Sequence, residues 1–361
     1  MASILPGDEL ISGEDRAMAT WVFDGIGLPA GDQVHLEAGA GDRETLPGRF
    51  ALPGLVDSHC HLTFGVGDHG PVLLGETEAR TMLDDLAQAG VGALRDVGGN
   101  RSVTLKLAAG PEDGRPVVLA AGRFVAPADS YFPGMYEPVP AAGLIAAVEA
   151  EIDAGATWIK LVGDFPAVGP DGPIRGSAVT PNYEPDAVAE MVAAVHARGA
   201  RVAAHTQTPF VSELVRAGID SVEHGDDLTA EDLEVLGARG GAWTPTLSAA
   251  MFGAENDTPE RRARRQARSE KAAAMLQLAR QYGVRVLAGS DVVGTVAGEV
   301  EQLVRHGLTV TQALEAASTC AREFLGLEGE GDLVTYDEDP RERPDVLATP
   351  AAVVLRGLRI R

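Results

Sequence analysis

Cysteine is almost absent from this chain, whose 361 residues include only Cys60 and Cys320. Two thiols cannot build a disulfide framework, which agrees with a reducing compartment. No run of about 18 apolar residues occurs, so no membrane-spanning helix is expected. The first residues have neither a basic start nor the apolar core of a secretory signal, and we therefore expect a cytoplasmic protein.

Positive charge is also scarce. The formal net charge is −23, and only three of the 30 basic residues are lysine, namely Lys106, Lys160 and Lys271. A field of this sign repels nucleic acids and anionic membranes, so we expect neither as a partner. The expected partner is a small molecule or a short peptide.

Short β-type runs alternate with amphipathic helical segments, two of which (75–90 and 184–199) end in glycine as helices commonly do. The strands are expected over 52–62, 91–97, 116–126, 157–163, 201–207, 221–225, 242–248 and 285–292. Eight strands that alternate with helices predict an α/β fold, a parallel sheet closed into a (β/α)8 TIM barrel. An open doubly wound sheet is less favoured, because no Gly-x-Gly-x-x-Gly turn follows the first strand.

Both ends of the chain depart from this alternation. Residues 1–50 are weakly periodic, and 331–361 contain two β-type runs with a turn between them. We expect these two segments to form a small β-sandwich domain and 51–330 to form the barrel. The stretch 250–282 is longer than a normal connection and holds an arginine-rich helix. A solvated helix is the favoured interpretation, and a partial lid over the site is the alternative.

Two histidines lie one residue apart in the first expected strand, in LVDSHCHL (55–62). Side chains alternate between the two faces of a strand, so Asp57, His59 and His61 share one face and Cys60 faces away. Two imidazoles on one face can bind one cation near the carboxyl end of the strand, where barrel active sites lie. Alone, the pair is a weak signal.

Four other expected strands carry a metal-competent or basic residue near the same end: Lys160, His205, His224 and Asp291. Each follows an apolar stretch and precedes a glycine-rich or polar loop. Unrelated polar residues would be costly to bury without partners at all these positions, so one shared site is favoured.

The order His-x-His, Lys, His, His, Asp resembles that of the amidohydrolase superfamily of metal-dependent hydrolases. The stretches LPGLVDSHCHL, GATWIKLV, ARGARVAAHTQT and LAGSDV are similar to those of its imidazolonepropionase-like and prolidase-like branch, within about residues 45–361. The resemblance implies hydrolysis of an amide C–N bond in a peptide-like or N-acyl amino-acid-like substrate. It also implies a possible homo-oligomer.

By this resemblance, His59, His61 and Asp291 would bind the more buried of two zinc or similar ions. His205 and His224 would bind the second ion, and Lys160, carboxylated by CO2, would bridge the two. A lysine in a strand core is easier to deprotonate, and the carbamate of a neutral amine is an anion suited to two cations. An unmodified Lys160 paired with a carboxylate is the alternative.

Asp291 is the expected catalytic residue. It would take a proton from a water molecule that the metal activates, and pass that proton to the leaving nitrogen. Candidate substrate contacts are Arg95, Tyr131, Tyr183 and Gln207. Arg95 could bind a substrate carboxylate, but a structural salt bridge explains it equally well. Gln207 stands where many relatives have a second histidine after His205.

Three other functions compete with this one. The first is a mononuclear relative that hydrolyses a cyclic amide or performs a deamination, against which Lys160 argues. The second is a hydrolase that tailors a peptide natural product. The third is a barrel that has lost catalysis and only binds, against which the complete ligand set argues.

Overall fold

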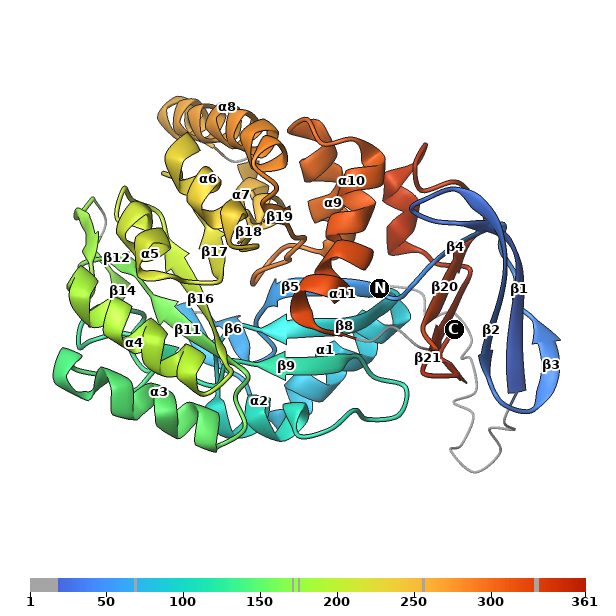
Figure 1. Cartoon of the computed structure of the whole chain (residues 1–361), viewed down its shortest axis with the longest axis horizontal. Coiled ribbons are helices and arrows are strands. Elements are labelled where there is room, and N and C mark those ends of the chain that lie inside the picture. The colour runs from blue at the N-terminus through green and yellow to red at the C-terminus, as the bar shows by residue number, and fades with distance from the viewer. Residues whose placement is uncertain (1–18, 68–69, 171, 175, 255–256, 328–330) are drawn as a thin grey trace, which may run out of the picture.

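The computed structural model describes residues 19–67, 70–170, 172–174, 176–254, 257–327 and 331–361. It is a mixed α/β structure, in which helices surround two parallel sheets and a further sheet lies at one side (Figure 1). Residues 1–18 of the expected terminal domain and 255–256 of the arginine-rich stretch lie outside the described residues. None of the described helices is long and apolar enough to cross a membrane.

The two parallel sheets contain all the strands that the sequence pattern predicts. The three-stranded sheet has the order β5 (Leu55–Cys60), β8 (Val91–Asp96), β9 (Val117–Ala120). The six-stranded sheet has the order β10 (Phe124–Val125), β11 (Trp158–Val162), β16 (Arg201–Thr206), β17 (Ser221–His224), β18 (Ala242–Thr244), β19 (Arg285–Val286). Their carboxyl ends therefore point the same way within each sheet.

Four of the predicted strands have wrong boundaries. The strand expected over 52–62 is regular only at Leu55–Cys60, and Leu52 belongs to β4 (Phe50–Leu52) in another sheet. The stretch 116–126 holds two strands, β9 and β10, rather than one. The strand expected over 242–248 ends at Thr244. Pro245 has no amide proton to donate to a neighbouring strand, and Thr246 is the N-cap of helix α7 (Leu247–Met251). The strand expected over 285–292 is regular only at Arg285–Val286.

Backbone hydrogen bonds continue past these strand ends. Ser58 donates to the carbonyl of Ala288 at 2.8 Å, and Asp291 donates to that of His59 at 2.7 Å. These bonds place β5 beside the segment that follows β19. At the other side, Ala121 donates to the carbonyl of Asp96 at 3.0 Å, which holds the link between β9 and β10 against β8.

Helices cover the outside of the parallel sheets (Figure 1). They are α1 (Glu76–Gln88), α2 (Arg101–Ala108), α3 (Leu144–Asp153), α4 (Pro185–Ala197), α5 (Val211–Ala217), α6 (Ala230–Ala238), α7, α8 (Pro259–Gln281), α9 (Val296–Arg305), α10 (Val310–Ala316) and α11 (Thr319–Leu325), with short 3-10 turns at Ala141–Gly143 and Pro344–Ala348. Buried apolar side chains such as Val148, Met191 and Leu214 pack between helices and sheet. Each such side chain contributes about 1.5–3 kcal/mol through its burial.

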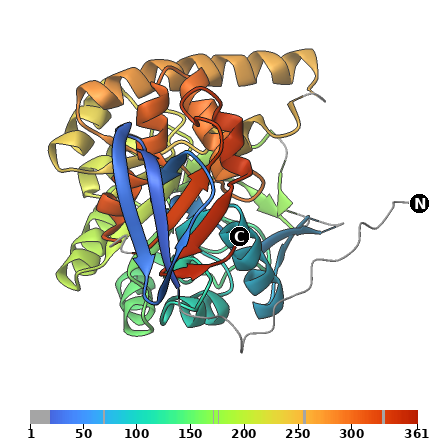
Figure 2. The same cartoon turned by 90° about the vertical axis from the view of Figure 1, so that its right-hand side faces the viewer.

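Strands from both ends of the chain share one sheet, seen in front in Figure 2. It has the order β2 (Asp32–Gly39), β1 (Ala19–Gly27), β4 (Phe50–Leu52), β20 (Leu333–Tyr336), β21 (Ala352–Leu355), β22 (Leu358–Arg359), and β3 (Asp42–Thr45) pairs with β1. The antiparallel pair of β4 and β20 joins the two ends. The sheet has an apolar cluster of its own, which includes Trp21, Phe23 and Leu333.

Small hairpins extend from the carboxyl side of the parallel strands. They are β6 (Phe64–Gly67) with β7 (Gly70–Leu73), β12 (Asp164–Pro166) with β15 (Val179–Pro181), and β13 (Val168–Gly169) with β14 (Gly172–Pro173). Together with α7 and α8 they supply the wall of the cavity described next.

Candidate active site and metal centre

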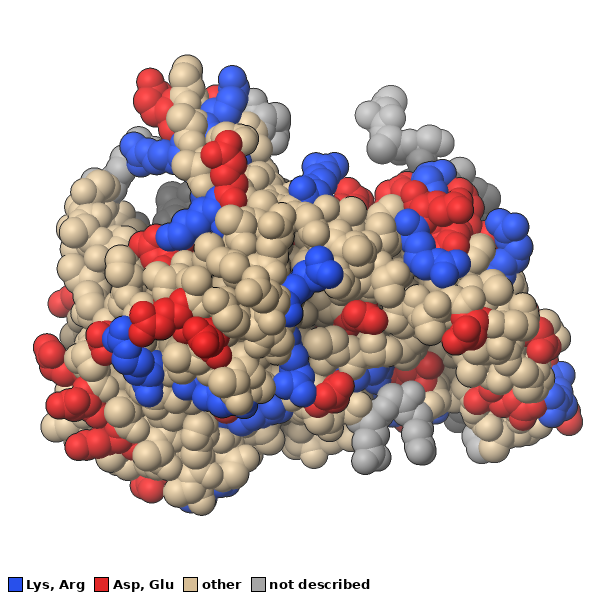
Figure 3. Space-filling model, turned by 45° about the horizontal axis from the view of Figure 1, so that its top comes forward, with Lys and Arg blue, Asp and Glu red and all other residues tan. Residues whose placement is uncertain are grey.

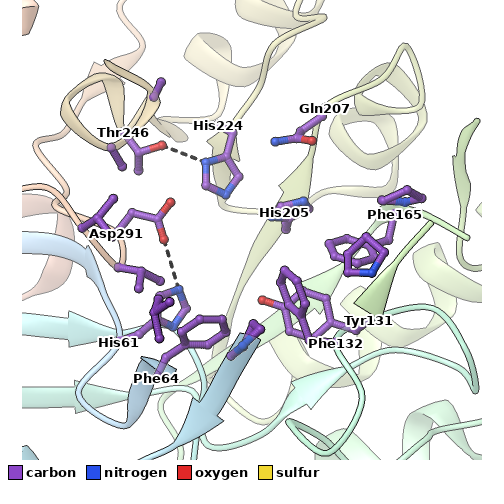
Figure 4. A pocket seen from close by; sticks show the side chains of 18 of the residues that line it. His61, Phe64, Tyr131, Phe132, Phe165, His205, Gln207, His224, Thr246 and Asp291 are labelled. Carbon is purple, nitrogen blue, oxygen red and sulfur yellow. Dashed lines mark hydrogen bonds and ion pairs between the residues drawn. The ribbon is translucent and has the colours of Figure 1, made fainter. Parts of the chain in front are cut away.

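A cavity of about 540 Å³ contains most of the predicted site residues. His61, Lys160, His205, His224 and Asp291 all line it, although they come from different strands or strand ends (Figure 4). Its volume lies within the range of small-molecule sites. Tertiary structure thus brings together residues that are up to about 230 positions apart in the chain.

His59 is completely buried beneath this cavity and is held by a carboxylate. Its Nδ1 lies 2.5 Å from Oε2 of Glu223, and the other oxygen of this carboxylate, Oε1, accepts hydrogen bonds from Arg95 at 2.7 Å and from Ser221 at 2.6 Å. An ionised carboxylate only accepts, so Nδ1 of His59 carries the proton. The lone pair of Nε2 is then free, and Nε2 has no hydrogen-bond partner within the part of the chain that the structure describes.

Two further histidines are fixed in the same tautomer. Nδ1 of His61 donates to the carbonyl of Gly98 at 2.8 Å. Nδ1 of His224 lies 2.7 Å from the hydroxyl oxygen of Thr246, and that hydroxyl itself donates to the carbonyl of Pro245. The Thr246 oxygen therefore accepts from His224. Each outer hydrogen bond leaves Nε2 available to a cation, as is usual for histidine ligands of metals.

Asp291 lies where these imidazoles converge. Its Oδ1 is 3.5 Å from Nε2 of His61 and 3.7 Å from Nε2 of His59, and its side chain is 23% exposed. Donor atoms of His59, His224 and Asp291 all lie within 4.8 Å of one another. The ring of His205 is 4.6 Å from that of His224, centre to centre. His59, His224 and Asp291 could together hold a metal ion.

Burial adjusts the protonation of this cluster. It lowers the pKa of His59 to about 4 and holds the pKa values of His205 and His224 well below the usual range. Burial also lowers the pKa of Lys160 to about 8. Burial works against ionisation of Asp291, but the neighbouring His61, His59 and His224 hold its pKa well below the usual range. Neutral imidazoles beside a carboxylate are the forms that bind metals.

Lys160 contrasts with the other buried charges. Its side chain is 1% exposed, and Nζ has no hydrogen-bond partner among the described residues. The alternative of a lysine paired with a carboxylate is therefore not seen. An unpaired buried amine is costly, and the cost falls if the amine is neutral or modified.

The backbone is strained at two of the ligand positions. His224 has φ 64° and Asp291 has φ 57°, both in the left-handed region that side chains other than glycine rarely adopt. In a regular strand, Glu223 and His224 would face opposite sides. The left-handed turn at His224 lets the carboxylate hold His59 while the imidazole that follows it reaches the cavity.

The four candidate substrate residues divide into two pairs. Tyr131 and Gln207 line the cavity, and Tyr131 packs in an aromatic wall with Phe132 and Phe165 at centroid distances of 5.0 and 4.8 Å. Arg95 is not on the cavity wall, because it is fully buried in the salt bridge to Glu223 and its guanidinium lies 4.4 Å from the Trp158 ring centre.

Tyr183 also lies away from the cavity wall. Its hydroxyl donates to the carbonyl of Val139 at 2.8 Å, which makes it a tether between loops. Cys60 faces the helices, as the strand alternation predicts, and packs with Leu83 and Leu94.

The sequence pattern did not single out Glu223, Thr246 or Arg268, a cavity residue from α8. Glu223 had a local signal, since it is the one acidic residue within the strand SVEH. Thr246 and Arg268 had no such signal in the sequence. Their places in the site depend on contacts between distant parts of the chain, which a local sequence pattern does not show.

A buried carboxylate on α9 supports the Thr246 contact from behind. Glu299 accepts hydrogen bonds from the amides of Leu247 at 2.9 Å and Ser248 at 2.6 Å, the first two residues of α7. Thr246, the residue before them, holds His224. Glu299 therefore positions the start of α7 and, through it, one candidate ligand.

Glu299 predicts a pH dependence of stability. Burial raises its pKa from 4.5 to about 7. Between these values the folded chain binds a proton that the unfolded chain has lost, so the unfolding free energy falls as pH rises from 4.5 to about 7. The interval corresponds to about 3 kcal/mol. In Glu299→Gln this part of the decline should be absent, as measured by chemical denaturation at four pH values across that range.

The matched control is Glu301→Gln on the same helix, whose side chain is 34% exposed. We expect it to follow the wild-type profile. A Glu299→Gln profile parallel to that of the wild type would contradict a buried, protonated Glu299.

Known proteins resemble this chain over most of its length. A sequence model described as the amidohydrolase family matches residues 50–334. This chain belongs to the amidohydrolase family. The chain is accordingly a hydrolase of C–N bonds, and the resemblance found in its motifs is confirmed. Uncharacterized proteins of Mycobacterium bovis and Mycobacterium tuberculosis are 34% identical over 361 residues, 95% of this amidohydrolase and 92% of each relative.

Solved structures resemble this amidohydrolase over almost its whole length. A Xaa-Pro dipeptidase has a TM-score of 0.77 at 22% identity, with 95% of this chain and 99% of that chain covered. Ochratoxinase of A. niger has a TM-score of 0.75 at 20% identity, with 96% of each covered. Bottromycin amidohydrolase has a TM-score of 0.67 at 22% identity, with 94% and 86% covered. These likenesses show a shared TIM-barrel-like α/β fold.

Proposed function

We propose that this amidohydrolase is a two-zinc enzyme that cleaves the amide bond of a peptide-like or N-acyl amino-acid-like substrate. The observation that carries the proposal is a pair of buried nitrogen atoms, Nε2 of His59 and Nζ of Lys160, that have no hydrogen-bond partner among the described residues. A buried polar atom without a partner costs about 1–3 kcal/mol. A cation would satisfy the first atom, and carboxylation would turn the second into an anionic ligand.

The residues at the cavity floor fit divalent ions. Three imidazoles have their Nδ1 protons engaged by Glu223, Gly98 and Thr246, so that their Nε2 lone pairs are free. Imidazole nitrogen and carboxylate oxygen are both usual zinc ligands.

We assign the ligands as follows from the motif order and this geometry. His59, His61 and Asp291 would hold one ion, His205 and His224 would hold the second, and a carbamate on Lys160 would lie between them. Bound zinc would supply an acidified water and a polarised substrate carbonyl.

Asp291 is the residue we assign to proton transfer. Its carboxylate is ionised, its Oδ1 lies 3.5 Å from Nε2 of His61, and it is partly exposed to the cavity. It would take the proton of the attacking water and return it to the leaving nitrogen as the C–N bond breaks. Tyr131 and Gln207 would contact the substrate beside it, and the aromatic wall would exclude water from the reacting amide.

One observation favours a second candidate. Within the described residues, the set of donor atoms that lie within 4.8 Å of one another comprises only His59, His224 and Asp291, which is enough for one ion. A mononuclear enzyme that opens a cyclic amide or deaminates its substrate would use such a site. A hydrolase that tailors a peptide natural product is a further substrate class for the two-ion enzyme.

The proposal also includes the closure of the barrel and the division of the chain into two domains. The bonds between β5 and the segment after β19 support one closed (β/α)8 barrel over 51–330. The pairing of β4 with β20 supports a terminal β-sandwich domain from 1–50 and 331–361. A cytoplasmic location, a small-molecule or short-peptide partner, and a homo-oligomer rest on the sequence alone.

The test is hydrolysis of a library of dipeptides and N-acyl amino acids by protein grown with zinc and bicarbonate. We expect release of an amine, loss of that activity in a chelator and its recovery on return of zinc. Elemental analysis should find about two metals per chain. One metal per chain, with turnover only of cyclic amides or amidines, would favour the mononuclear enzyme. Turnover that survives complete metal removal would contradict both.

A further inference from the structure

One face of α8 carries arginines that the proposed chemistry does not use. Arg264 and Arg265 lie three and four residues after Arg261, and Arg268 lies four and three residues after them, which places the four on one side of the helix. With Ala249, Ala250, Phe252 and Asp257 they line a cavity of about 450 Å³.

This second cavity adjoins the active-site cavity. Arg268, Ala249 and Ala250 line both. A substrate whose reacting amide lies beside Asp291 can therefore extend past Arg268 and along α8. The active-site cavity alone already has the volume for a dipeptide-sized group, so the second cavity offers room for a longer substrate.

The second cavity has an excess of positive charge. Arg268 pairs with Asp226 at 2.8 Å, and Arg265 pairs with Asp257 at 2.7 Å. Within the ranges that the structure describes, Arg261 and Arg264 form no ion pair. Two guanidinium groups thus remain available to a carboxylate, which they can bind through two parallel hydrogen bonds.

This local charge is opposite to that of the chain as a whole, which is −23. On the face shown in Figure 3, basic and acidic side chains lie in small groups that often adjoin one another. A solvated helix would account for the arginines alone. It does not account for Phe252, an aromatic side chain that is 66% exposed beside them.

We propose that the arginine-lined cavity is an extended substrate subsite that binds an acidic side chain of a peptide, beyond the residues that flank the cleaved amide. The preferred substrates are then acidic peptides of three or more residues. The proposal rests on the proposed function, because the subsite is defined by its continuity with the amide-cleaving cavity.

The test uses metal-loaded protein and tetrapeptides that differ only by Glu or Gln at one position. Each position is scanned in turn, and the quantity measured is the Glu-to-Gln ratio of kcat/KM. In the wild type we expect a ratio of about 10 to 100 at one position distant from the cleaved bond, the range for a hydrogen bond to a charged group. Added salt should lower that ratio.

Arg264→Gln should bring the ratio close to one. This variant removes no ion pair among the described residues, so it should fold, and a ratio measured within one variant is insensitive to a general loss of activity. The control is Arg280→Gln in the last turn of α8, which removes the same charge from a residue that lines neither cavity. We expect the control to keep the wild-type ratio.

Two outcomes would overturn the subsite and leave the proposed function intact. They are cleavage of both peptides by the wild type at equal rates at every position, and a Glu preference that Arg264→Gln retains. If no tetrapeptide is cleaved, the proposed function fails for peptides. Calorimetric titration of the same Glu and Gln peptides then decides the subsite, since tighter binding of Glu that is lost in Arg264→Gln supports it and equal binding overturns it.

Discussion

Replacement of Asp291 by asparagine is expected to lower kcat by about 100- to 10,000-fold, the usual contribution of a general acid–base. Asparagine keeps the size of the side chain and one oxygen in the place of Oδ1, so the cluster with His61 and His59 should persist. It cannot accept a proton from the attacking water. The measurements are kcat on the amide that the wild type cleaves best, metal content per chain and thermal stability.

The control is Asp84→Asn, an exposed carboxylate on α1 that pairs with Arg115. It makes the same chemical change far from the cavity and should leave kcat near the wild-type value. Turnover of Asp291→Asn near that of the wild type, with metal still bound, would remove Asp291 from the proton-transfer role. Loss of both metal and turnover would assign it a ligand role only.

Replacement of Lys160 by alanine is expected to reduce the metal content from about two to about one per chain and to abolish most amide hydrolysis. The Nζ atom is buried without a partner among the described residues, and burial lowers its pKa to about 8. About one tenth of the amine is then neutral at pH 7 and can add CO2. Alanine leaves a buried space with no anion between the ligand groups. Elemental analysis and kcat are the measurements.

The chain offers a matched control in Lys106→Ala. Lys106 is one of only three lysines, is 60% exposed and pairs with Glu76 on the surface. We expect it to keep wild-type metal content and activity. A short carboxylic acid such as propionate, added to Lys160→Ala, should restore part of both, because it can supply an anion in the space left by the side chain. One metal in both the wild type and Lys160→Ala would contradict the bridging role.

The sequence by itself determined which residues could bind metal and the order in which they occur. His59, His61, Lys160, His205, His224 and Asp291 each follow an apolar strand, and parallel strands bring their carboxyl ends to one side of a sheet. The alternation of side chains between the two faces of a strand also predicted that Cys60 faces away from the cavity. The structure brings His61, Lys160, His205, His224 and Asp291 to one cavity and packs Cys60 away from it, because both placements depend on local alternation and on one general rule of α/β folds.

Only the tertiary structure decided how those residues are held. The carboxylate of Glu223 reaches His59 from 164 positions away, and Arg95 serves that carboxylate rather than the cavity. The left-handed turns at His224 and Asp291 break the strand alternation from which faces were predicted.

The role of α8 was likewise outside the reach of the sequence. Its arginine spacing shows that Arg261, Arg264, Arg265 and Arg268 share a face, but not what that face meets. A charged helix can cover solvent or a cavity with the same periodicity, because the pattern records only which residues lie together on the helix. The position of α8 in the fold decides whether its arginine face meets solvent or a cavity. That position depends on contacts such as the ion pair of Arg268 with Asp226, which lies just after β17. Such contacts exist only in the folded chain.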